Sequence, residues 1–460
     1  MTRFICLFLC IIFLFTGSFA QDTSPGNETP MQFSLQQARD YALEHNINVK
    51  NTQLDVLIAR KKVWETTSLG LPQVNGSASY TNIFEVPEMS FGPYIDWSGM
   101  PMGVPVTPEM VLGNYRDSEP IQLGVKENIK WDVTLSQLIF SGEYIVGLQA
   151  AKIFKQLSEQ NLSKSKLDII ESITQTYFLV VLAEENKNIL EKSTANTKQI
   201  WEEMKKTNEV GLIDETTVLQ LELTYKNLQN TINNINRQVE LSYELLKIQM
   251  GIPSEQKIVL TDRLESIFVQ ADIDGLVKTE FNIDNHIDFQ LLNTQEKLTQ
   301  LSLRREKATI LPTISAFFMH QEQVNSPDFN FFNPNMLGVS VSLPIFASGQ
   351  RYVKIQQARL ELEKIRNTRE LVSQNLEISV MQAKSDLKTA YDKYQNEKEN
   401  LTLSERIYND YLAKFREGTV SSLELTQVQN QLLATRGNYL GAMVELLNAK
   451  NKLDKALNNY

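Results

Sequence analysis

The feature of this chain that most constrains its fold is an internal repeat of a heptad pattern. Shifting residues 211–250 forward by 207 positions aligns Gly211 with Gly418 and lays one apolar series on another. The first series is Val218, Tyr225, Ile232, Val239 and Leu246, and the second is Leu425, Leu432, Tyr439, Leu446 and Leu453. Apolar residues at every seventh position form the seam between packed helices. The sequence therefore predicts two long helical hairpins of the same construction.

A weaker repeat extends this duplication toward the start of the chain. At an offset of 240 positions, the aligned pairs are Asn46 with His286, Leu71 with Leu311, and Pro72 with Pro312. Duplication of this kind is typical of architectures built from repeated units rather than of single active sites. We expect a first structural repeat over residues 21–251, with a β-hairpin at 72–141, then a linker over 252–281, and a second repeat over 282–460, with a β-hairpin at 312–346.

Residues 1–20 have the composition of a secretory signal peptide. Arg3 precedes an apolar run over residues 4–15, and small residues follow it up to Ala20. The run is too short to span a bilayer, which disfavours a retained membrane anchor. The sequence therefore predicts cleavage after Ala20.

Cysteine content and charge exclude several classes of function. Both cysteines, Cys6 and Cys10, lie in the predicted signal peptide, so the mature chain is expected to have no disulfide and no Cys metal site. The formal net charge of −10 argues against nucleic acid as a partner.

The distribution of proline predicts long helices. Prolines are absent from residues 121–252 and 345–460, the two windows that hold the heptads. We expect helices at residues 34–69, 143–206, 212–250, 283–309, 349–416 and 421–456. At a rise of 1.5 Å per residue, the helix from residue 143 would be about 95 Å long, as in a rod or a tunnel wall. After residue 20 no apolar run is long enough for a membrane-spanning helix, so membrane insertion would require β-strands.

Between the helices, four stretches alternate apolar and polar residues in the manner of half-buried strands. They cover residues 73–84, 129–136, 312–320 and 337–343. The third is less regular, because Phe317 and Met319 fall on its polar side. The strands form two hairpins, whose connections at 85–128 and 321–336 are long and contain several Pro and Phe residues. A further short strand is expected at residues 257–260.

Four strands with one apolar face cannot stand alone in a bilayer, because open edges leave backbone groups unpaired in hydrocarbon. Two chains would close an eight-stranded barrel filled by side chains, whereas three give twelve strands and an aqueous lumen, which the long helices favour. The expected fold class is an α+β membrane protein with long antiparallel helices and a 12-stranded trimeric β-barrel, with four strands per chain and internal duplication. The strand residues expected to face outer-membrane lipid are Trp131, Val133, Val339 and Val341.

The order of these features resembles the TolC family of outer-membrane efflux proteins. The resemblance covers roughly residues 32–456 and rests on motifs that occur twice: Leu71-Pro72 and Leu311-Pro312 at strand entries, Phe140-Ser141-Gly142 and Phe346-Ala347-Ser348-Gly349 at strand exits, and Gly211 and Gly418 at helix tips. It implies a homotrimeric channel-tunnel in the outer membrane of a Gram-negative bacterium, in which a long antiparallel α-helical barrel continues the 12-stranded β-barrel across the periplasm. It also implies a periplasmic adaptor (membrane fusion protein) and an inner-membrane pump as partners.

The resemblance also implies an adaptor-docking site at the helix tips. Val210-Gly211-Leu212 matches the Val-Gly-Leu signature that family adaptors engage, and Glu417-Gly418-Thr419 resembles the Val-Gly-Thr signature. Glu417 replaces valine in the second, so that dock lacks the apolar side chain of the family signature. Both glycines would also serve a tight turn whether or not a partner docks there.

A pore constriction is implied six and nine positions after the second tip glycine, where family members often carry two acidic residues. This chain has Glu424 and Gln427 there. Three copies of Glu424 facing one axis would repel one another, raise their own pKa and favour cations. The alternative is a solvated carboxylate beside the heptad position Leu425.

No catalytic or metal constellation is visible. His45, His286 and His320 are not paired at metal-ligand spacing, and no phosphate-binding glycine loop or nucleophile elbow occurs, so we expect no enzyme activity, no cofactor and no metal. The leading interpretation is a passive exit duct for an efflux or secretion system. The alternatives are a non-conducting periplasmic or surface coiled-coil structural protein and, less well supported, a hydrolase. The cargo of such a duct would be a drug, a metal ion or a polypeptide.

Overall fold

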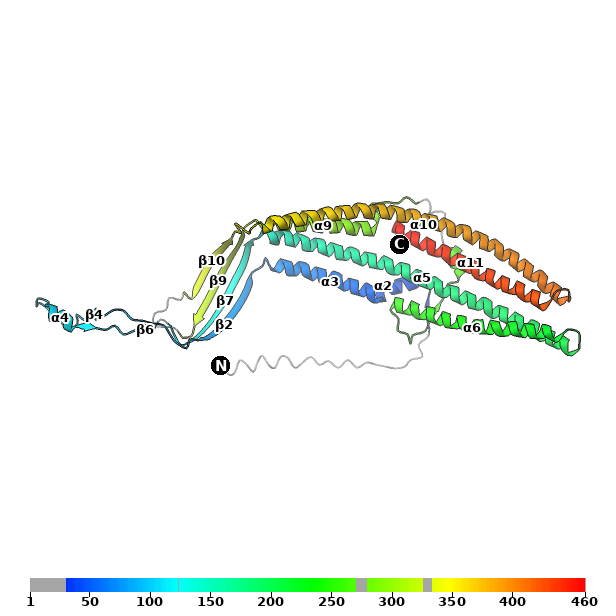
Figure 1. Cartoon of the computed structure of the whole chain (residues 1–460), viewed down its shortest axis with the longest axis horizontal. Helices are drawn as coiled ribbons and strands as arrows, with labels where there is room; N and C mark the ends of the chain where they lie inside the picture. The colour runs from blue at the N-terminus through cyan, green and yellow to red at the C-terminus, as the bar shows by residue number, and fades with distance from the viewer. Residues whose placement is uncertain (1–29, 123, 270–278, 326–332, 460) are drawn as a thin grey trace.

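The computed structural model describes residues 30–122, 124–269, 279–325 and 333–459. This part of the chain is an elongated molecule, with a four-stranded sheet toward one end and long helices that run from the sheet to the opposite end (Figure 1). The predicted signal peptide lies outside the described residues. Among the described helices, none is both long and apolar enough to cross a membrane.

Long helices make up most of the molecule, as predicted. They are α2 (Leu35–His45), α3 (Ile47–Ser68), α5 (Gly142–Glu209), α6 (Glu215–Met250), α9 (Ile287–Ala308), α10 (Gln350–Arg416) and α11 (Ser422–Leu457). Among the described residues, three short helical elements accompany them: α4 (Pro108–Gly113), α7 (Leu264–Val269) and the 3₁₀ turn η1 (Ile283–Asn285). α5 packs along α6, and α10 packs along α11, so the two predicted helical hairpins are present.

The prediction of one helix over residues 34–69 was wrong, because the chain breaks at Asn46. The Asn46 side chain accepts hydrogen bonds from the backbone N–H groups of Asn48 and Val49 and so caps α3. Its amide also donates to the carbonyl of Gln249 at the end of α6, 2.6 Å away. A residue 203 positions distant in the chain therefore helps to place this break.

Two other predicted helices begin later than expected because a side chain caps them. α6 begins at Glu215, since the carboxylate of Asp214 accepts from the N–H of Thr217. The helix predicted from residue 283 begins as η1, and α9 follows with His286 as its N-cap.

The four main strands form one antiparallel sheet in the order β10-β9-β7-β2. Their bounds are β2 (Gln73–Asn82), β7 (Glu127–Phe140), β9 (Thr313–Gln323) and β10 (Asn335–Ser342). The two predicted hairpins, β2–β7 and β9–β10, join through β7 and β9, with an irregularity in register between Leu138 and Phe140. Within the described residues, β2 and β10 are the edges of this sheet.

The long connection predicted at residues 85–128 contains regular structure of its own. It holds β3 (Glu88–Met89), β4 (Tyr94–Ile95), β5 (Tyr115–Arg116) and β6 (Ile121–Gln122), in addition to α4. β3 pairs with β6 and β4 pairs with β5, both antiparallel. Part of the second connection, residues 326–332, lies outside the described residues.

The core lies near the middle of the long axis. The strand expected at residues 257–260 is β8 (Ile258–Leu260), which pairs in parallel with β1 (Met31–Phe33), a partner that the sequence analysis missed. Tyr177 of α5 is fully buried beneath this pair, and its hydroxyl donates to the carbonyl of Phe33 at 3.1 Å. The other large buried side chains around it include Ile173, Leu246, Met250, Leu264, Leu387, Met443, Leu446 and Leu453.

The shorter helices share the length of α5 and α10. In the half of the molecule near the sheet, α3 packs on α5, and α9 packs between α5 and α10. In the half near the helix tips, α6 packs on α5, and α11 packs between α5 and α10. α11 ends near the point where α9 begins, as the C-terminus marks in Figure 1. Each repeat thus contains a joint at which one helix ends and another begins.

Candidate functional site

One face of the sheet is largely apolar, with Gln137, His320 and Glu322 among its polar members. Trp131 and Val133 in β7 share a face with Gln137, which lies opposite Ala316 in β9, and Ala316 lies opposite Val339 in β10. The four residues predicted to face lipid are therefore on the same side of the sheet, and they are 36% (Trp131), 40% (Val133), 68% (Val339) and 63% (Val341) exposed. Val74, Tyr80, Ile129, Leu135, Phe318 and Leu337 extend this face.

The opposite face of the sheet is mostly polar, although Leu138 and Met336 lie on it. It carries Gln73, Asn75, Ser77, Ser79, Lys130, Asp132, Thr134, Ser136, Ser315, Gln321, Ser340 and Ser342. Phe317 and Met319 also lie on it, which explains the irregular alternation of β9. A Cβ atom on Gly338 would meet the Phe317 ring at 2.6 Å, so the glycine leaves the space that this ring occupies.

The two helix tips have the same backbone geometry. Gly211 and Gly418 both have a φ of 76°, the left-handed region that glycine tolerates. Gly211 N donates to Asn208 O and Leu212 N to Thr207 O, and the same pattern joins Gly418 to Phe415 and Thr419 to Lys414. The turn itself therefore accounts for both glycines.

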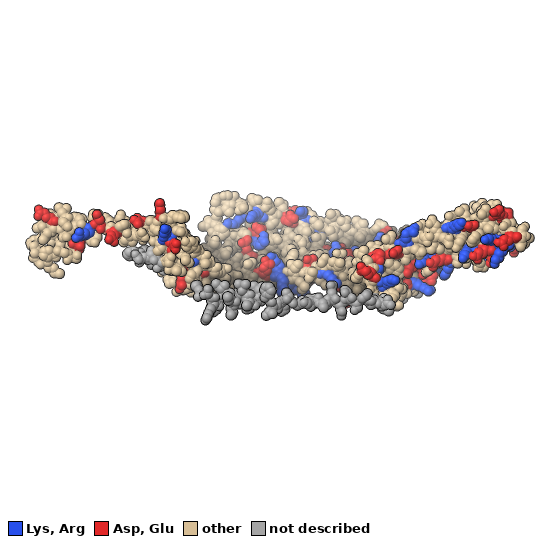
Figure 2. Space-filling view, turned by 90° about the horizontal axis from the view of Figure 1, so that it is seen from below, with Lys and Arg blue, Asp and Glu red and all other residues tan. Residues whose placement is uncertain are grey.

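The side chains at the tips are accessible to a partner, and those at the first tip are apolar. Val210 is 70% exposed and Leu212 is 76% exposed, and Glu417 and Thr419 are also exposed at the second tip. Ile200, Leu221, Phe415 and Leu425 form a small core behind the tips, and Ser422 donates a hydrogen bond to Gln220, which links α11 to α6. Figure 2 shows mixed charges crowding this end of the molecule.

Glu424 is exposed but not free, because it belongs to a capping box at the start of α11. Its carboxylate accepts from the Ser421 hydroxyl at 2.7 Å and from the Ser421 backbone N–H at 2.9 Å. These hydrogen bonds lower the pKa of Glu424, the opposite direction to the rise expected from repulsion among three carboxylates. Gln427 is exposed one turn further along α11. The Ser-x-x-Glu spacing of Ser421 and Glu424 is the signal in the sequence that indicates this cap.

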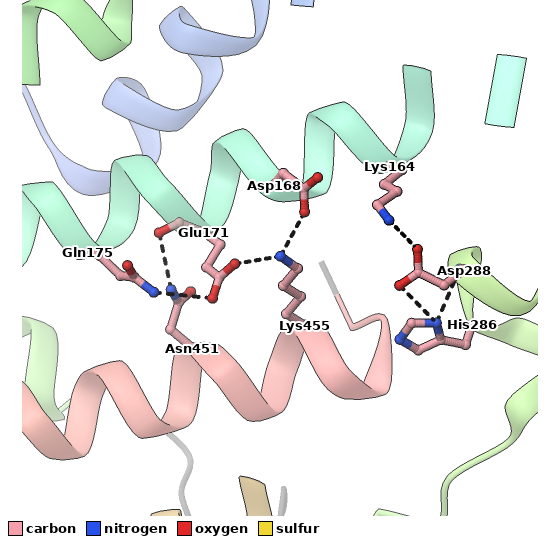
Figure 3. Close-up of polar contacts among 8 residues, drawn as sticks. All are labelled: Lys164, Asp168, Glu171, Gln175, His286, Asp288, Asn451 and Lys455. Carbon is pink, nitrogen blue, oxygen red and sulfur yellow. Dashed lines mark hydrogen bonds and ion pairs between the residues drawn. The ribbon is translucent and has the colours of Figure 1, made fainter. Parts of the chain in front are cut away.

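Charged side chains surround the joint between α11 and α9 (Figure 3). Lys455 of α11 pairs with two carboxylates of α5, Asp168 at 2.7 Å and Glu171 at 2.6 Å. Lys164 of α5 pairs with Asp288 of α9 at 2.5 Å. α5 is thereby tied to both helices that meet at the joint.

The two joints occupy equivalent places in the repeats but differ in packing. In the first, a Cβ atom on Gly251 would lie 2.5 Å from the carbonyl oxygen of His45, so the backbones are in close contact. In the second, Asn458 donates to the carbonyl of Asn285 at 3.2 Å, and a cavity of about 570 Å³ lies between α5, α10 and the ends of α9 and α11. His286, the counterpart of Asn46, borders this cavity.

Among the described residues, no group of His, Cys, Asp and Glu side chains could hold a metal ion. His45 stacks on Tyr41, and His286 caps α9. The ring of His320 in β9 lies edge-on to the Trp131 ring, with 5.6 Å between the ring centroids. The three histidines are thus in three separate places. The described residues form long helix pairs, a sheet with two different faces and two similar helix tips.

Comparisons with known proteins agree with this geometry. Residues 283–459 match the model of the outer membrane efflux protein family. No curated protein matches the chain. The solved structures with a similar fold include the CmeC outer membrane channel of Campylobacter jejuni (TM-score 0.70, 19% identity, 92% of this chain and 85% of that chain), CusC (TM-score 0.70, 17% identity, 92% and 91%) and the outer membrane protein VceC of Vibrio cholerae (TM-score 0.67, 14% identity, 92% and 95%).

These likenesses extend over both repeats and confirm the fold class that the sequence predicted. The family model and these solved structures are of outer-membrane proteins, in agreement with the predicted location. Over residues 283–459 the chain matches the outer membrane efflux protein family, and over most of its length it has the fold of the solved outer-membrane channels.

Proposed function

We propose that three copies of this chain form the exit duct of a tripartite efflux or secretion system. The observation that carries the proposal is a four-stranded sheet with edges at β2 and β10, placed at one end of helix pairs that extend from it. Three such sheets, each joining its β2 to a partner's β10, would close a twelve-stranded barrel with an aqueous lumen. The 68 residues of α5 would carry the duct about 100 Å beyond the barrel.

The proposed duct is passive and depends on partners. A periplasmic adaptor would dock at the helix tips, where Val210 and Leu212 are exposed, and an inner-membrane pump would supply the cargo and the energy. Because each chain has two tips of one geometry, a trimer would offer six similar docking positions. Exposed apolar side chains at a helix turn are suited to contact with a partner.

The docking step is tested with charged substitutions at the tips. We expect the Gly211→Glu, Gly418→Glu double variant to lose export while its trimer still assembles in the outer membrane. Asparagine tolerates a left-handed backbone, so the Gly211→Asn, Gly418→Asn variant is the matched control and should retain most export. Leu212→Glu adds charge without altering a glycine and should also impair export. Normal export by both charged variants would overturn the docking proposal.

Conduction is tested separately from docking. The purified trimer in a planar bilayer should conduct ions without any partner, because the lumen is a property of the trimer alone. A detergent-stable trimer that never conducts would instead favour the alternative of a non-conducting coiled-coil structural protein. A monomer that keeps its full β-sheet signal in detergent would contradict the pooled barrel itself.

A further inference from the structure

A marked charge asymmetry occurs where the helices meet the sheet. α3 and α9 end there, and α5 and α10 begin there (Figure 1). The eleven residues of each helix nearest the sheet are 58–68, 142–152, 298–308 and 350–360. Together they contain ten basic and three acidic residues, although the whole chain has a net charge of −10. The sheet end of the helices is therefore basic in an acidic protein.

Three of these basic residues lie on one side of α9 and α10. A groove of about 690 Å³ runs between the two helices on this side and is lined by Asn293 and Arg366, among others. Arg304 and Lys307 follow Asn293 by about three and four helical turns. Arg359 precedes Arg366 by about two turns. Arg304, Lys307 and Arg359 therefore project on the side of the groove, where all three are exposed, and they form the basic patch.

The basic patch is not neutralised within the described part of the chain, where no carboxylate lies within ion-pair distance of its three residues. Glu306 lies between Arg304 and Lys307 in the sequence, but it projects from the other side of α9 and pairs with Arg305 at 3.4 Å. On α10, acidic residues reach the side of the patch only from Glu363 onward, further from the sheet. The uncompensated positive charge is thus confined to the end of the helices next to the sheet.

Between the sheet and the patch, the exposed side chains change from apolar to aromatic. Phe346, which precedes α10, is 85% exposed. Tyr352 is 69% exposed and lies two turns before Arg359, on the same side of α10. Tyrosine is enriched where hydrocarbon meets lipid headgroups, and Lys and Arg side chains near a membrane place their charge among those headgroups. The order apolar, aromatic, basic is therefore the order expected across one leaflet of a bilayer.

The side of the basic patch corresponds to the exterior of the proposed duct. The chain enters α9 through η1, and Asp284 of η1 lines the groove on this side. A segment of chain on the lumen side would obstruct the duct, so this side faces outward. On the opposite side of α9, Leu291 lines a second groove with Lys164, whose charge is paired with Asp288 at 2.5 Å. The cations without an ion-pair partner thus face the surroundings of the duct.

We propose that the basic patch binds the phosphate groups of anionic phospholipids in the leaflet of the outer membrane that faces the periplasm. Lys307 precedes Ile314, the first residue of β9 on the largely apolar face of the sheet, by seven positions. One lipid can therefore contact the patch with its headgroup and the sheet with its acyl chains. Basic side chains close to a membrane surface attract anionic lipid over roughly a Debye length, about 8 Å at physiological ionic strength. This inference rests on the proposed trimeric duct and its orientation.

The lipid that stays bound to the purified trimer tests the proposal. After incubation in detergent with equal amounts of phosphatidylglycerol and phosphatidylethanolamine, native mass spectrometry should detect at least fivefold more bound phosphatidylglycerol. The Arg304→Gln, Lys307→Gln, Arg359→Gln variant should assemble normally, because these residues are exposed, and should retain the two lipids nearly equally. Arg304→Lys, Arg359→Lys keeps the charge and should keep the preference.

A matched control removes the same charge at the other end of the helices. Lys205, Lys206 and Arg416 are exposed near the tips, far from the sheet. Lys205→Gln, Lys206→Gln, Arg416→Gln should leave the lipid preference unchanged. An equal loss of preference in this control would mean that net charge rather than the basic patch selects the lipid, which would overturn the proposal.

Inorganic phosphate distinguishes a lipid site from a site for free anions. Phosphate should not displace phosphatidylglycerol more than chloride does at equal ionic strength, because the acyl chains also contribute to the contact. Specific displacement by phosphate, or an unchanged preference in the triple glutamine variant, would overturn the lipid site. Either result leaves the duct intact if the wild-type trimer conducts in a planar bilayer. A wild-type trimer that never conducts contradicts the duct, whereas the lipid comparison still decides whether the patch binds phospholipid.

Discussion

At the scale of single residues, the protonation state of His286 determines whether its side chain can cap α9. Its Nδ1 accepts a hydrogen bond from the N–H of Asp288 at 3.2 Å, which requires an unprotonated nitrogen. Burial lowers the pKa of His286 below its usual value of about 6.5; the charge of Asp288 opposes this, and Lys164 and Lys455 reinforce it. The charged groups around the adjoining cavity are Asp168, Glu171 and Lys164 from α5, Asp386 from α10, Lys452 and Lys455 from α11, and Asp288 from α9.

This cap should make the start of α9 sensitive to acid. Because the pKa of His286 is lower in the folded protein, the unfolded chain binds more protons below pH 6.5. The stabilisation is therefore complete above that pH and decreases as the pH falls through it. His286→Asn, which introduces the residue found at the equivalent Asn46, should keep the cap and remove this dependence. The effect is measured as the protection factor of the amides in the first turn of α9, compared between pH 7.5 and pH 5.5.

A control for this prediction is His45→Asn, since His45 stacks on Tyr41 and does not cap a helix. It should leave the acid sensitivity of α9 unchanged. If wild type and His286→Asn lose the same protection against amide exchange at pH 5.5, protonation of His286 does not control the cap.

Charge at the tips should persist to low pH because of a second cap. The hydrogen bonds from Ser421 lower the pKa of Glu424 below its usual value of 4.5, so its carboxylate stays ionised as the pH falls toward that value. If Glu424 lines the constriction, Glu424→Gln should reduce cation preference in bilayer recordings, and Gln427→Glu should increase it. Ser421→Ala removes the side-chain hydrogen bond that lowers the pKa of Glu424, so the loss of selectivity should move to higher pH. Unchanged selectivity in both charge variants would place the constriction elsewhere.

At the scale of elements, a buried carboxylate joins α9 to α10. Glu296 is only 6% exposed, with Arg366 at 3.1 Å and Arg369 at 2.6 Å. Burial acts to raise the pKa of Glu296, but the hydrogen bond from Arg366 and the charge of Arg369 hold it below its usual value. The 240-residue offset places Val56 of the first repeat at this position, and Val56 is also buried. The same packing position is thus apolar in one repeat and ionic in the other.

This comparison predicts that removing the two arginines costs more stability than replacing Glu296. The Arg366→Ala, Arg369→Ala double variant would leave Glu296 buried and unpaired, which typically costs about 3–5 kcal/mol. Glu296→Val leaves two arginines that are already half exposed and installs the residue of the first repeat, so its cost should be about 1–2 kcal/mol. Denaturant unfolding of detergent-solubilised trimers compares them. A larger loss in Glu296→Val than in the double arginine variant would contradict this account.

The elements that the sequence predicted are those with local signals. Heptads, proline-free windows and period-two alternation located the long helices and the four main strands within a few residues. The break at Asn46 was missed because the end of α6, far away in the chain, helps to place it. β1 is only three residues long and pairs with a strand more than two hundred residues later. The tip glycines could be identified from the repeat, whereas the cap that engages Glu424 required attention to side-chain hydrogen bonding.

At the scale of the whole molecule, duplication explains both ends of the structure. Each repeat contributes one strand hairpin and one long helix pair, so the hairpins meet in one sheet and the helix pairs end in two similar tips. The repeats diverge at Asn46 and His286, at Gly251 and Asn458, and in the connections within the strand hairpins, of which the first holds two short ladders and α4. The repeated features thus account for the shared architecture, and His286 is one of the differences between the repeats.

The two faces of the sheet should respond very differently to the same charge. Val133 lies on the apolar face and is 40% exposed, whereas the adjacent Thr134 lies on the polar face beside Asp132. In the trimer, Val133→Asp would place three carboxylates against hydrocarbon, and Thr134→Asp would place three toward the aqueous lumen. Each carboxylate facing lipid costs up to a few kcal/mol, depending on its depth in the bilayer, and threefold symmetry multiplies that cost.

We therefore expect Val133→Asp to reduce the amount of heat-modifiable trimer in the outer membrane several-fold, with Thr134→Asp close to wild type. Val133→Asn is the matched variant without charge. Its assembly should fall between those of the two aspartate variants, because transfer out of water costs an amide less free energy than it costs a carboxylate. Equal assembly of Val133→Asp and Thr134→Asp would mean that the apolar face does not contact lipid. Impaired assembly of Thr134→Asp alone would mean that the sheet faces are reversed, with the apolar side chains turned inward.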